Sequence, residues 1–515
     1  MPPAAVPDEV LTTPLTGYLL RNAAEDRPAF TCRTFPGPAD HTLTWPRLLA
    51  RVRGVARELR RFTRPGDRVA IVARQDLDYV VAFLGTLYAG RVAVPLSVPI
   101  GRTSRARIES AFADATPTAC LTSKNLVEKV PSPPAVVLAV EDIEPADAEP
   151  PAAVAMTDPA YLQYTSGSTR RPAGAVISHR ALVASCWQTT RCYHADASTP
   201  LAGWVPFFHD MGLVLLIATP VFLGSRSVFF TPMEFVRDPL RWIRLLAEHP
   251  GVISAAPNFA FDLASEAAGD LEAVDLSRVN SVLNGSEPVR AATVEAFERA
   301  FAPFGLPRAA QKPAYGLAEA TVFVTSAGDE GPTVRTFDDG EPRVSVGRPY
   351  GQRIRIVDEE IWVSGPNVAD GYWGRPDDAD TFTEDGWLRT GDLGFVHDGL
   401  LYVAGRLKDL IIVDGRNHYP QDIEATVEAA HPSVRRVAAF AVRDGRGEGV
   451  AVVAGCTAPD ESVETAVRRA VSAGHDLPLR ALWLVRPGEV PRTSSGKVSR
   501  AAARERWWGE NERHG

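Results

Sequence analysis

The sequence is poor in cysteine and contains no Cys-x-x-Cys pair. Five cysteines occur among 515 residues, an odd number that argues against a disulfide framework. This usage favours a reducing compartment, so we predict a cytoplasmic protein in which each cysteine is a small buried apolar residue.

Long hydrophobic runs are also absent. The longest apolar stretch, Leu213 to Gly224, contains Pro220 and is well short of the roughly 20 residues that a membrane-spanning helix needs. The N-terminal segment has neither a basic flank nor an apolar run, so we expect no signal peptide. We therefore predict no membrane span and interpret residues 213–224 as buried core.

The chain has no excess of basic residues. Its net charge is -8, whereas a nucleic-acid-binding protein usually carries a basic stripe. Hydrophobic residues make up 45% and charged residues 23% of the chain, which is typical of a globular enzyme with large cores. The length predicts roughly three structural units.

Strand and helix patterns alternate along the chain. Residues 67–73 read as a buried strand, residues 78–90 as a helix and residues 91–96 as the next strand. This order predicts an α/β fold with a parallel sheet and crossover helices. The pattern recurs at residues 118–123, 251–257 and 279–289, and a helical pattern follows at 290–305.

Other regions depart from this pattern. Residues 130–156 are rich in proline and acidic residues, and we predict a surface connection there. From about Gly340, short strand patterns separated by turns predict a small β-rich subdomain. The last hundred or so residues form a further, separate α/β pattern.

The stretch YTSGSTRRPAG, residues 164–174, lies between two strand patterns and is crowded with hydroxyl side chains. Gly167 allows backbone conformations that other residues avoid, and successive N–H groups with these hydroxyls can form a concave anion site. The Gly-Lys-[Ser/Thr] ending of a Walker loop is missing. The residues alone leave two interpretations open, a phosphate-binding loop or an ordinary turn.

Further short motifs carry side chains suited to catalysis or binding. They are His209 and Asp210 in WVPFFHDMG, Gly285 and Ser286 in NGSEP, Tyr315 and Glu319 in PAYGLAEAT, Asp392 in RTGDLG, Arg406, Lys408 and Asp409 in GRLKDL, and Lys497 in PRTSSGKVSR. The NGSEP motif follows a strand pattern, where ligand sites gather in open α/β sheets. Taken singly, each motif has an ordinary alternative, such as a packed core histidine, a turn-capping aspartate or a surface lysine.

Together and in this order, the motifs resemble those of the adenylate-forming superfamily, which includes acyl-CoA synthetases, luciferases and the adenylation domains of peptide synthetases. The resemblance covers nearly the whole chain and is strongest for the fatty acyl-AMP ligase branch. The stretches that carry it are LQYTSGSTRRPAG, PFFHDMGL, APNFAFDL, NGSEPV, YGLAEAT, EIWVSGPNVADGYW, GRLKDLIIVDGRNHYPQDIE and SSGK.

The resemblance implies a fold and a division of the chain. The fold class is α/β, with a large N-terminal domain of two stacked α/β sheet subdomains plus the β-rich subdomain, and a small mobile C-terminal α/β domain. We expect an ATP- and acyl-binding domain at residues 1–404, a hinge at 405–409 that includes Lys408, and a C-terminal lid at 410–515.

The resemblance also implies a reaction. A carboxylic acid is joined to the α-phosphate of ATP in the presence of Mg²⁺, pyrophosphate leaves, and the acyl group passes to the phosphopantetheine thiol of a holo acyl carrier protein. The small domain swings about Lys408 between the two steps, which removes Lys497 and clears a path for the thiol.

The family's residue roles carry over to matching positions. Glu319 is implied to hold Mg²⁺, Lys497 to contact the α-phosphate and the attacking carboxylate, and His209 to lie between the acyl pocket and the nucleotide. Asp392 and Arg406 are implied to bind the ribose, Tyr315 to stack on adenine, and Gly285 and Ser286 to line the base pocket. The pyrophosphate end of ATP is implied to be held by Thr165, Ser166, Gly167, Ser168, Thr169 and Arg170.

Two departures from the wider superfamily bear on these expectations. Arg170 and Ala173 stand where the usual phosphate loop has glycine and lysine, as in fatty acyl-AMP ligases, and Arg170 or Arg171 is our candidate for the lost positive charge. The insertion that this branch carries near the end of its large domain, linked to its refusal of coenzyme A, is short here. The choice between carrier protein and coenzyme A as acceptor therefore stays open.

Three functional hypotheses follow. The leading one is a stand-alone ligase that loads a carrier protein with a fatty or other apolar acid. The second keeps adenylation but changes the acid to an aryl, amino or another oxyacid, with Asp262 as a candidate partner for an amino group, or changes the acceptor to coenzyme A. The third is a degenerate relative that only binds nucleotide or a partner, and the presence of Glu319, Asp392, Arg406 and Lys497 speaks against it.

Overall fold

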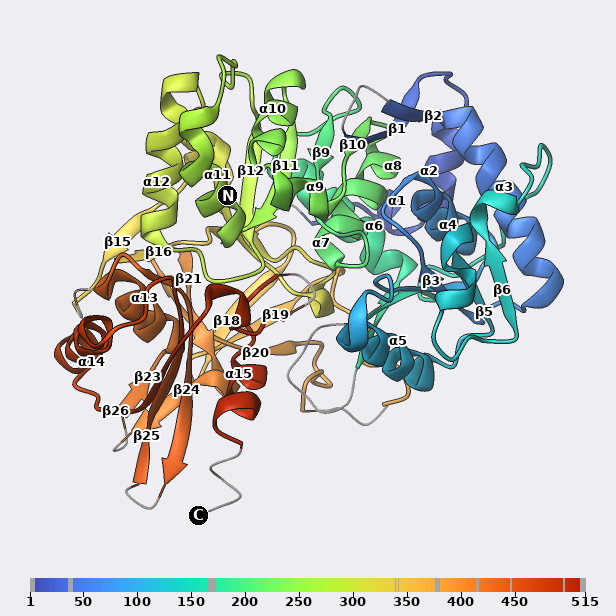
Figure 1. Ribbon diagram of the computed structural model, residues 1–515. Helices are drawn as coiled ribbons and strands as arrows, with labels where there is room; N and C mark the ends of the chain where they lie inside the picture. Colours follow the sequence, from blue (N-terminus) through green and yellow to red (C-terminus); the bar gives the residue numbers. More distant parts are fainter. Residues whose placement is uncertain are drawn as a thin grey trace. The chain divides into compact units, whose positions relative to one another are not determined.

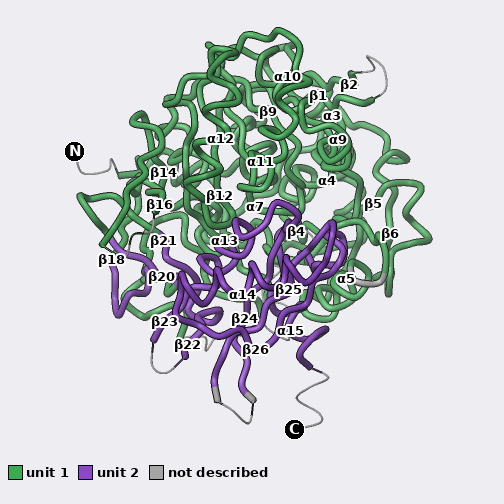
Figure 2. Tube along the Cα trace, turned by 60° about the vertical axis from the view of Figure 1, so that its left-hand side comes forward, with its two compact units in different colours: residues 1–355, 362–389, 396–402 green, residues 356–361, 390–395, 403–515 purple. Residues whose placement is uncertain are grey.

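The computed structural model describes residues 5–35, 40–164, 173–338, 340, 342–375, 380–413, 416–444, 447–493 and 496–509. The chain divides into two units, which Figure 2 shows in different colours. The first unit comprises residues 1–355, 362–389 and 396–402, and the second comprises residues 356–361, 390–395 and 403–515. Each unit has a hydrophobic core of its own.

A six-stranded sheet of order β6-β5-β3-β4-β7-β8 lies in the first unit, and Figure 1 labels its strands β3, β5 and β6. Its strands are β3 (Arg68–Val72), β4 (Val92–Pro95), β5 (Ala119–Thr122), β6 (Val136–Ala139), β7 (Pro159–Tyr164) and β8 (Gly174–Ser178). Neighbouring strands pair in parallel except β7 and β8, and helices α4 (Leu77–Tyr88) and α5 (Gly101–Ala115) connect parallel strands. The predicted parallel sheet with crossover helices is confirmed.

The prediction for residues 130–156 is wrong in part. That segment contains β6, an edge strand that pairs in parallel with β5, and is not only a surface connection. The strand has four residues, none of them fully buried, and prolines precede it. The apolar run AVVLAV that contains it is short and is flanked by prolines and acidic residues, which favoured the interpretation as a surface connection.

A nine-stranded sheet of order β17-β14-β13-β12-β11-β9-β10-β1-β2 also lies in the first unit. Its strands are β1 (Pro28–Arg33), β2 (Asp40–Thr44), β9 (Leu201–Gly203), β10 (Ser227–Phe229), β11 (Ile253–Pro257), β12 (Ser281–Gly285), β13 (Gln311–Tyr315), β14 (Thr325–Ser326) and β17 (Arg348–Pro349). The strands from β13 to β1 in this order pair in parallel, and β14, β17 and β2 pair antiparallel. The carboxyl ends of β11, β12 and β13 therefore meet at one edge of the sheet.

Helices cover these sheets. They include α1 (Asp8–Leu11), α2 (Leu15–Asn22), α3 (Trp45–Phe62), α6 (His179–Cys192), α7 (Asp210–Leu213), a π-helix (Val214–Ala218), α8 (Thr219–Leu223), α9 (Pro232–Arg237), α10 (Leu240–Glu248), α11 (Asn258–Ala267) and α12 (Ala291–Phe301). The segment from α7 through the π-helix to Val221 of α8 is almost entirely buried, which confirms the predicted core role of this apolar stretch. No helix in the described part of the chain is both long enough and apolar enough to cross a bilayer. All five cysteines are buried and unpaired.

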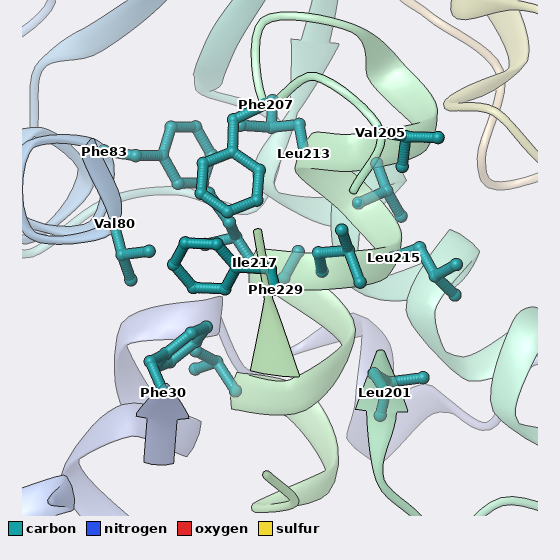
Figure 3. Close-up of a cluster of buried hydrophobic side chains, with 14 of the residues drawn as sticks. Phe30, Val80, Phe83, Leu201, Val205, Phe207, Leu213, Leu215, Ile217 and Phe229 are labelled. Carbon is teal, nitrogen blue, oxygen red and sulfur yellow. The ribbon is translucent and has the colours of Figure 1, made fainter. Parts of the chain in front are cut away.

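A cluster of large apolar side chains contains residues from β1, α4, β9, β10 and the π-helix (Figure 3). The Phe207 ring lies in this cluster, with its centroid 4.7 Å from that of Phe229 and 5.5 Å from that of Tyr79. Phe207 comes two residues before His209 in the sequence. The core thus anchors the segment that leads to a predicted site residue.

A four-stranded sheet of order β18-β19-β20-β21 follows, and the division between the two units runs through its strands. The strands are β18 (Arg353–Val357), β19 (Glu360–Ser364), β20 (Leu388–His397) and β21 (Leu400–Arg406), and the short pair β15 (Val334–Thr336) and β16 (Pro342–Val344) precedes them. Asp358 and Glu359, both with positive φ, form the tight turn between β18 and β19. These short strands confirm the predicted β-rich region.

The second unit contains a three-stranded sheet with apolar clusters on both faces. Its elements are β22 (Ile411–Val413), β23 (Arg416–His418), α13 (Pro420–Ala430), β24 (Val434–Asp444), β25 (Gly447–Cys456), α14 (Glu461–His475), β26 (Leu479–Val485) and α15 (Arg500–Trp507). One cluster joins β24 and β25 to α13 and α14, and the other joins these strands to α15. Alternating apolar residues on β24 and β25 supply both clusters, because successive side chains point to opposite faces.

Phe297 of α12 tests the core of the first unit. It is fully buried, and its ring centroid lies 4.8 Å from that of Phe261 and 4.6 Å from that of Phe301. We expect Phe297→Ala to lower the free energy of unfolding by about 3–5 kcal/mol, because it removes buried apolar area and leaves a cavity. Urea unfolding followed by tryptophan fluorescence measures this. The control is Phe62→Ala on α3, a side chain that is 46% exposed, and equal losses in both variants would contradict this assignment.

Candidate active site

A cavity opens where β12 and β13 end. Its volume is about 570 Å³ including the open mouth. The lining residues are Thr189, Asp210, Met211, Val214, Leu215, Ala255, Leu283, Gly285, Ser286, Ala314, Tyr315, Gly316, Val322 and Phe323. Gly285, Ser286 and Tyr315 are thus brought together as lining residues, whereas His209 and Glu319 are not among them.

The strand ends shape one wall of this cavity by close backbone packing. A Cβ atom on Gly285 would lie 2.8 Å from the carbonyl oxygen of Ala314, and one on Gly316 would lie 1.4 Å from the carbonyl oxygen of Val322. Ser286 adopts a positive φ of 69°, which is unusual for a residue with a side chain. Two glycines therefore let the segments after β12 and β13 lie against neighbouring backbone.

His209 and Asp210 form a close pair beside the cavity. The Nδ1 atom of His209 lies 2.5 Å from an Asp210 carboxylate oxygen, and the same oxygen accepts a hydrogen bond from the backbone N–H of Met211 at 2.7 Å. Asp210 is buried and begins α7. The pair gives the cavity a carboxylate whose position is determined by a side chain and a backbone group.

Two glutamine side chains, which sequence reasoning missed, hold the segment before His209. The Nε2 group of Gln75 lies within hydrogen-bond distance of the carbonyl oxygens of Trp204, Val205 and Phe230, and its Oε1 accepts from the N–H of Phe207. Gln163 of β7 donates to the carbonyl oxygen of Phe208 at 3.0 Å. A glutamine inside the apolar pattern AYLQY was the available sequence signal for Gln163.

Glu319 lies in a short turn after β13. Its Oε1 accepts a hydrogen bond from the hydroxyl of Tyr372 at 2.7 Å. The side-chain amide of Asn367 donates to the carbonyl oxygens of Ala320 and Phe323, at 2.7 and 2.8 Å, and so stabilises this turn. Within the described residues, no three His, Cys, Asp or Glu side chains gather as a metal site, so Glu319 offers a single carboxylate.

The predicted phosphate loop follows β7 and lies beyond the residues that the structure describes. Thr165, Ser166, Gly167, Ser168, Thr169, Arg170 and Arg171 lie outside the described residues. The strands on either side of them pair antiparallel, with Tyr164 opposite Gly174. Burial and the hydrogen-bonded Asp114 carboxylate raise the pKa of the Tyr164 hydroxyl, which lies 2.6 Å from that carboxylate.

The second unit holds the other predicted residues. Asp392 of β20 is buried, and its carboxylate lies 2.9 Å from Nε of Arg406, the last residue of β21. These two predicted ribose ligands are thus brought together. Lys497 lies in a hairpin in which its carbonyl oxygen accepts from the N–H of Thr493 at 2.7 Å.

Sequence reasoning missed an ion cluster of three residues, Asp409, Glu424 and Arg500. Asp409 directly follows Lys408, and Arg500 lies shortly after Lys497. The guanidinium of Arg500 donates two hydrogen bonds of 2.7 Å to Glu424 and one of 3.2 Å to Asp409. Burial alone would lower the pKa of Arg500, but the charges of Glu424 and Asp409 outweigh it and raise the pKa. This cluster holds the turn at Asp409, α13 and the start of α15 in one arrangement.

Asp262, the candidate partner for an amino group, is engaged elsewhere. It lies on α11, where it pairs with Arg290 and accepts a hydrogen bond of 2.7 Å from Thr293. It is not among the residues that line the cavity.

Two family models match the chain. One described as AMP-binding enzyme matches residues 20–373, and one described as Disco-interacting protein 2-like, AMP domain matches residues 408–514. The chain is 40% identical to the long-chain-fatty-acid–AMP ligase FadD26 of Mycobacterium marinum, over 95% of this chain and 96% of that protein. It is 39% identical to a 4-hydroxyphenylalkanoate adenylyltransferase of Mycobacterium tuberculosis, over 95% and 91%.

A solved structure from studies of fatty acyl-adenylate ligases of E. coli and L. pneumophila superimposes with a TM-score of 0.88. The sequence identity is 29%, and the match covers 98% of this chain and 99% of that chain. The predicted fold class is thereby confirmed. The region aligned with the Mycobacterium marinum protein spans 568 residues, more than the whole of this chain, so that relative has additional residues within the matched region.

Gly316 tests the packing that shapes the cavity. Because a Cβ atom there would overlap the carbonyl oxygen of Val322, Gly316→Ala must displace the segment 316–323. We expect faster hydrogen–deuterium exchange in that segment and a loss of unfolding free energy of about 3 kcal/mol or more. The matched control is Gly269→Ala, where nothing lies within 4 Å of the added Cβ atom. Unchanged exchange at 316–323 in the Gly316 variant would contradict the described packing.

Proposed function

Because the chain belongs to the AMP-binding enzyme family, we propose that it activates an apolar carboxylic acid with ATP and passes the acyl group to a carrier protein. The chain is a ligase of the acyl-AMP-forming kind, as the sequence predicted. In the first step a carboxylate oxygen bonds to the α-phosphorus, and the bond to the bridging oxygen of pyrophosphate breaks. In the second step a thiolate attacks the acyl carbon, and AMP leaves. The observation that supports this most is the cavity at the ends of β12 and β13.

The first step brings two anions together, so its catalysis depends on position and on charge neutralisation. We assign the neutralising role to the ammonium group of Lys497 and to the loop 165–170, with Arg170 or Arg171 supplying positive charge. A lysine on a long flexible stem suits a charge that develops only during the reaction.

The nucleotide is assigned to three groups of residues. Gly285 and Ser286 face the base, and the ring of Tyr315 stacks on it. Asp392 accepts hydrogen bonds from the ribose hydroxyls, and the ion pair with Arg406 supports this by orienting the carboxylate.

Glu319 fits the role of the Mg²⁺ ligand. Proteins bind Mg²⁺ through one or two carboxylates together with phosphate oxygens and water, and the single Glu319 carboxylate matches this donor set. The hydroxyl of Tyr372 donates to its Oε1 and so orients the carboxylate. When bound, Mg²⁺ neutralises charge on the phosphate oxygens.

The cavity favours an apolar acid. Met211, Val214 and Leu215 supply one side of it, and Leu283 and Phe323 add to the apolar lining. The carboxylate in the lining, Asp210, is paired with His209, and Asp262 is paired with Arg290, which argues against an amino-acid substrate. Two relatives of nearly equal identity are named for different acids, a long-chain fatty acid and a 4-hydroxyphenylalkanoate, so identity alone does not choose between an alkyl and an aryl tail.

The second step of the proposal requires a thiol that accepts the acyl group. The resemblance to fatty acyl-AMP ligases favours a carrier protein as acceptor. Against this, the region before β18 is short and the turn between β18 and β19 has two residues, so the insertion linked to refusal of coenzyme A is reduced.

One experiment identifies both the acid and the acceptor. The enzyme is mixed with ATP, Mg²⁺, a fatty-acid mixture, coenzyme A and a holo carrier protein, and the products are identified by mass spectrometry. Formation of acylated carrier protein would support the proposal. Formation of acyl-coenzyme A alone would show that the acceptor is coenzyme A and not a carrier protein.

Lys497 tests the adenylation step. We expect Lys497→Ala to lower the rate of ATP–pyrophosphate exchange by about 100-fold or more, since one positioned charge contact in a transition state is worth that much. The control is Lys129→Ala, an exposed lysine at the end of a short 3-10 helix, which should exchange as the unaltered enzyme does. Exchange by the Lys497 variant within a few-fold of the unaltered rate would refute the assigned role.

Asp409 tests the hinge assigned to Lys408. Asp409→Asn weakens one arm of the Arg500 cluster and leaves the paired contacts to Glu424. If the turn at Lys408 and Asp409 sets the balance between two orientations of the second unit, the variant changes the ratio of pyrophosphate exchange to thiol transfer by about threefold or more. Transfer is measured in a single turnover from isolated acyl-AMP.

Thermal unfolding of Asp409→Asn shows whether that variant has lost stability. A second control is Glu464→Gln, which weakens the exposed ion pair between Glu464 and Arg468 on α14. It should leave the ratio of pyrophosphate exchange to thiol transfer unaltered. Equal changes of both half-reactions in Asp409→Asn would show a general loss of stability and would contradict the hinge role.

A further inference from the structure

The motif EIWVSGPNVADGYW, residues 360–373, supplies a buried asparagine to the turn that follows β13. Asn367 is fully buried, and its side-chain amide donates to the carbonyl oxygens of Ala320 and Phe323 at 2.7 and 2.8 Å. One side chain therefore holds two backbone groups of the turn 319–323. No step of the proposed reaction uses this asparagine directly.

The turn that Asn367 holds has an unusual backbone. Thr321 and Val322 have positive φ angles of 48° and 72°, a conformation that is costly for β-branched residues. The hydroxyl of Thr321 donates back to the carbonyl oxygen of Asn367 at 2.7 Å, and the hydroxyl of Ser185 donates to the carbonyl oxygen of Thr321 at 2.5 Å. Because a strained backbone persists only where its surroundings impose it, these hydrogen bonds determine the course of the chain through residues 319–323.

Glu319, the proposed Mg²⁺ ligand, is held by residues that closely follow Asn367. The N–H of Ala369 donates to the carbonyl oxygen of Glu319 at 2.8 Å. The hydroxyl of Tyr372 donates to its Oε1 at 2.7 Å. Both the backbone and the carboxylate of Glu319 are thus positioned by the motif that contains Asn367.

The same segment also pairs with β8, the strand that follows the predicted phosphate loop in the sequence. The N–H of Val176 donates to the carbonyl oxygen of Gly371 at 2.9 Å, and the N–H of Asp370 donates to the carbonyl oxygen of Val176 at 3.0 Å. Residues 367–373 therefore connect β8 to the turn that carries Glu319. All of these contacts lie within the first unit.

We propose that Asn367 is a positioning residue for Mg²⁺ binding and that it acts through Glu319. By holding the strained turn, it keeps the Glu319 carboxylate where that carboxylate and the phosphate oxygens can share one cation. The inference rests on the proposed function, in which Glu319 is the Mg²⁺ ligand. Groups that orient a metal ligand without touching the metal commonly change metal affinity by about 10–100-fold when they are removed.

The test measures, without turnover, how much Mg²⁺ tightens nucleotide binding. The probe is α,β-methylene-ATP, whose α-phosphorus cannot release pyrophosphate, and its binding is followed by calorimetry with Mg²⁺ and with EDTA. The ratio of the two dissociation constants gives the coupling between metal and nucleotide. We expect Asn367→Ala to lower this ratio about tenfold and to change metal-free binding much less. Tyr372→Phe, which removes the hydroxyl that donates to Glu319, should lower the ratio as well.

Glu319→Gln shows whether Asn367 acts through Glu319. It should remove most of the coupling, and adding Asn367→Ala in that background should lower the coupling no further, because both changes affect one ligand. The matched control is Asn22→Ala, since the amide of Asn22 also donates to a backbone carbonyl oxygen, that of Val221, at 2.7 Å. This control should keep the ratio of the unaltered enzyme. Asn367→Ser, a smaller polar replacement, repeats the test if the alanine variant does not fold.

Two outcomes would overturn the inference on its own. One is an Asn367→Ala variant that keeps the ratio while Glu319→Gln lowers it. The other is an Asn367→Ala variant that weakens nucleotide binding equally with and without Mg²⁺, as a merely structural residue would. If Glu319→Gln itself leaves the ratio unaltered, the assignment of Glu319 fails and the inference fails with it. Adenylation is tested separately by pyrophosphate exchange, so the two failures are distinguishable.

Discussion

Parallel pairing of β11, β12 and β13 is the constraint on which the proposed site depends. In the register of the sheet, Pro257 lies opposite Gly285, and Asn284 lies opposite Pro313. The segments that follow these strands therefore start side by side although they are far apart in the sequence. A slip of one residue in either pair would turn the side chains to the other face of the sheet and would dismantle the wall that Ser286 and Tyr315 form.

The charged residues proposed for the site come from both units, and this arrangement is consistent with a two-step reaction. Glu319 belongs to the first unit, whereas Asp392, Arg406, Lys408 and Lys497 belong to the second. A cation needed to join two anions is a hindrance once the acyl adenylate has formed, because it continues to stabilise that intermediate. In the proposed mechanism, the segment after the hinge at Lys408 withdraws Lys497 after the first step, while Asp392 and Arg406, which precede Lys408, keep the nucleotide part of the intermediate in place.

Much of the fold was predictable from sequence, because apolar periodicity reports the elements directly. The strands at 68–72 and 92–95 and the buried segment 213–224 are examples. The missed features lack such a local signal. Gln75 acts through backbone carbonyls more than a hundred residues away, and Arg500 joins carboxylates from two distant segments. Neither residue lies in a pattern that distinguishes it from a surface side chain.

The same distinction applies to the site. The proximity of Asp392 and Arg406 was implied by the family resemblance, and it is present in the structure. The sequence did not predict that α6 and the π-helix line the cavity. A π-helix and a regular helix have the same apolar sequence pattern, so the π-helix could not be recognised in advance.

The two sides of the cavity are built by different means, and this separates nucleotide binding from acid selection. On the side assigned to the nucleotide, Gly285 and Gly316 pack against neighbouring backbone, so the geometry tolerates little change. Elsewhere in the lining, Thr189 of α6 and Leu215 of the π-helix contribute residues that do not belong to the sheet. A substitution at these positions alters the lining without changing a strand. The acid can therefore change while the adenylation chemistry is kept.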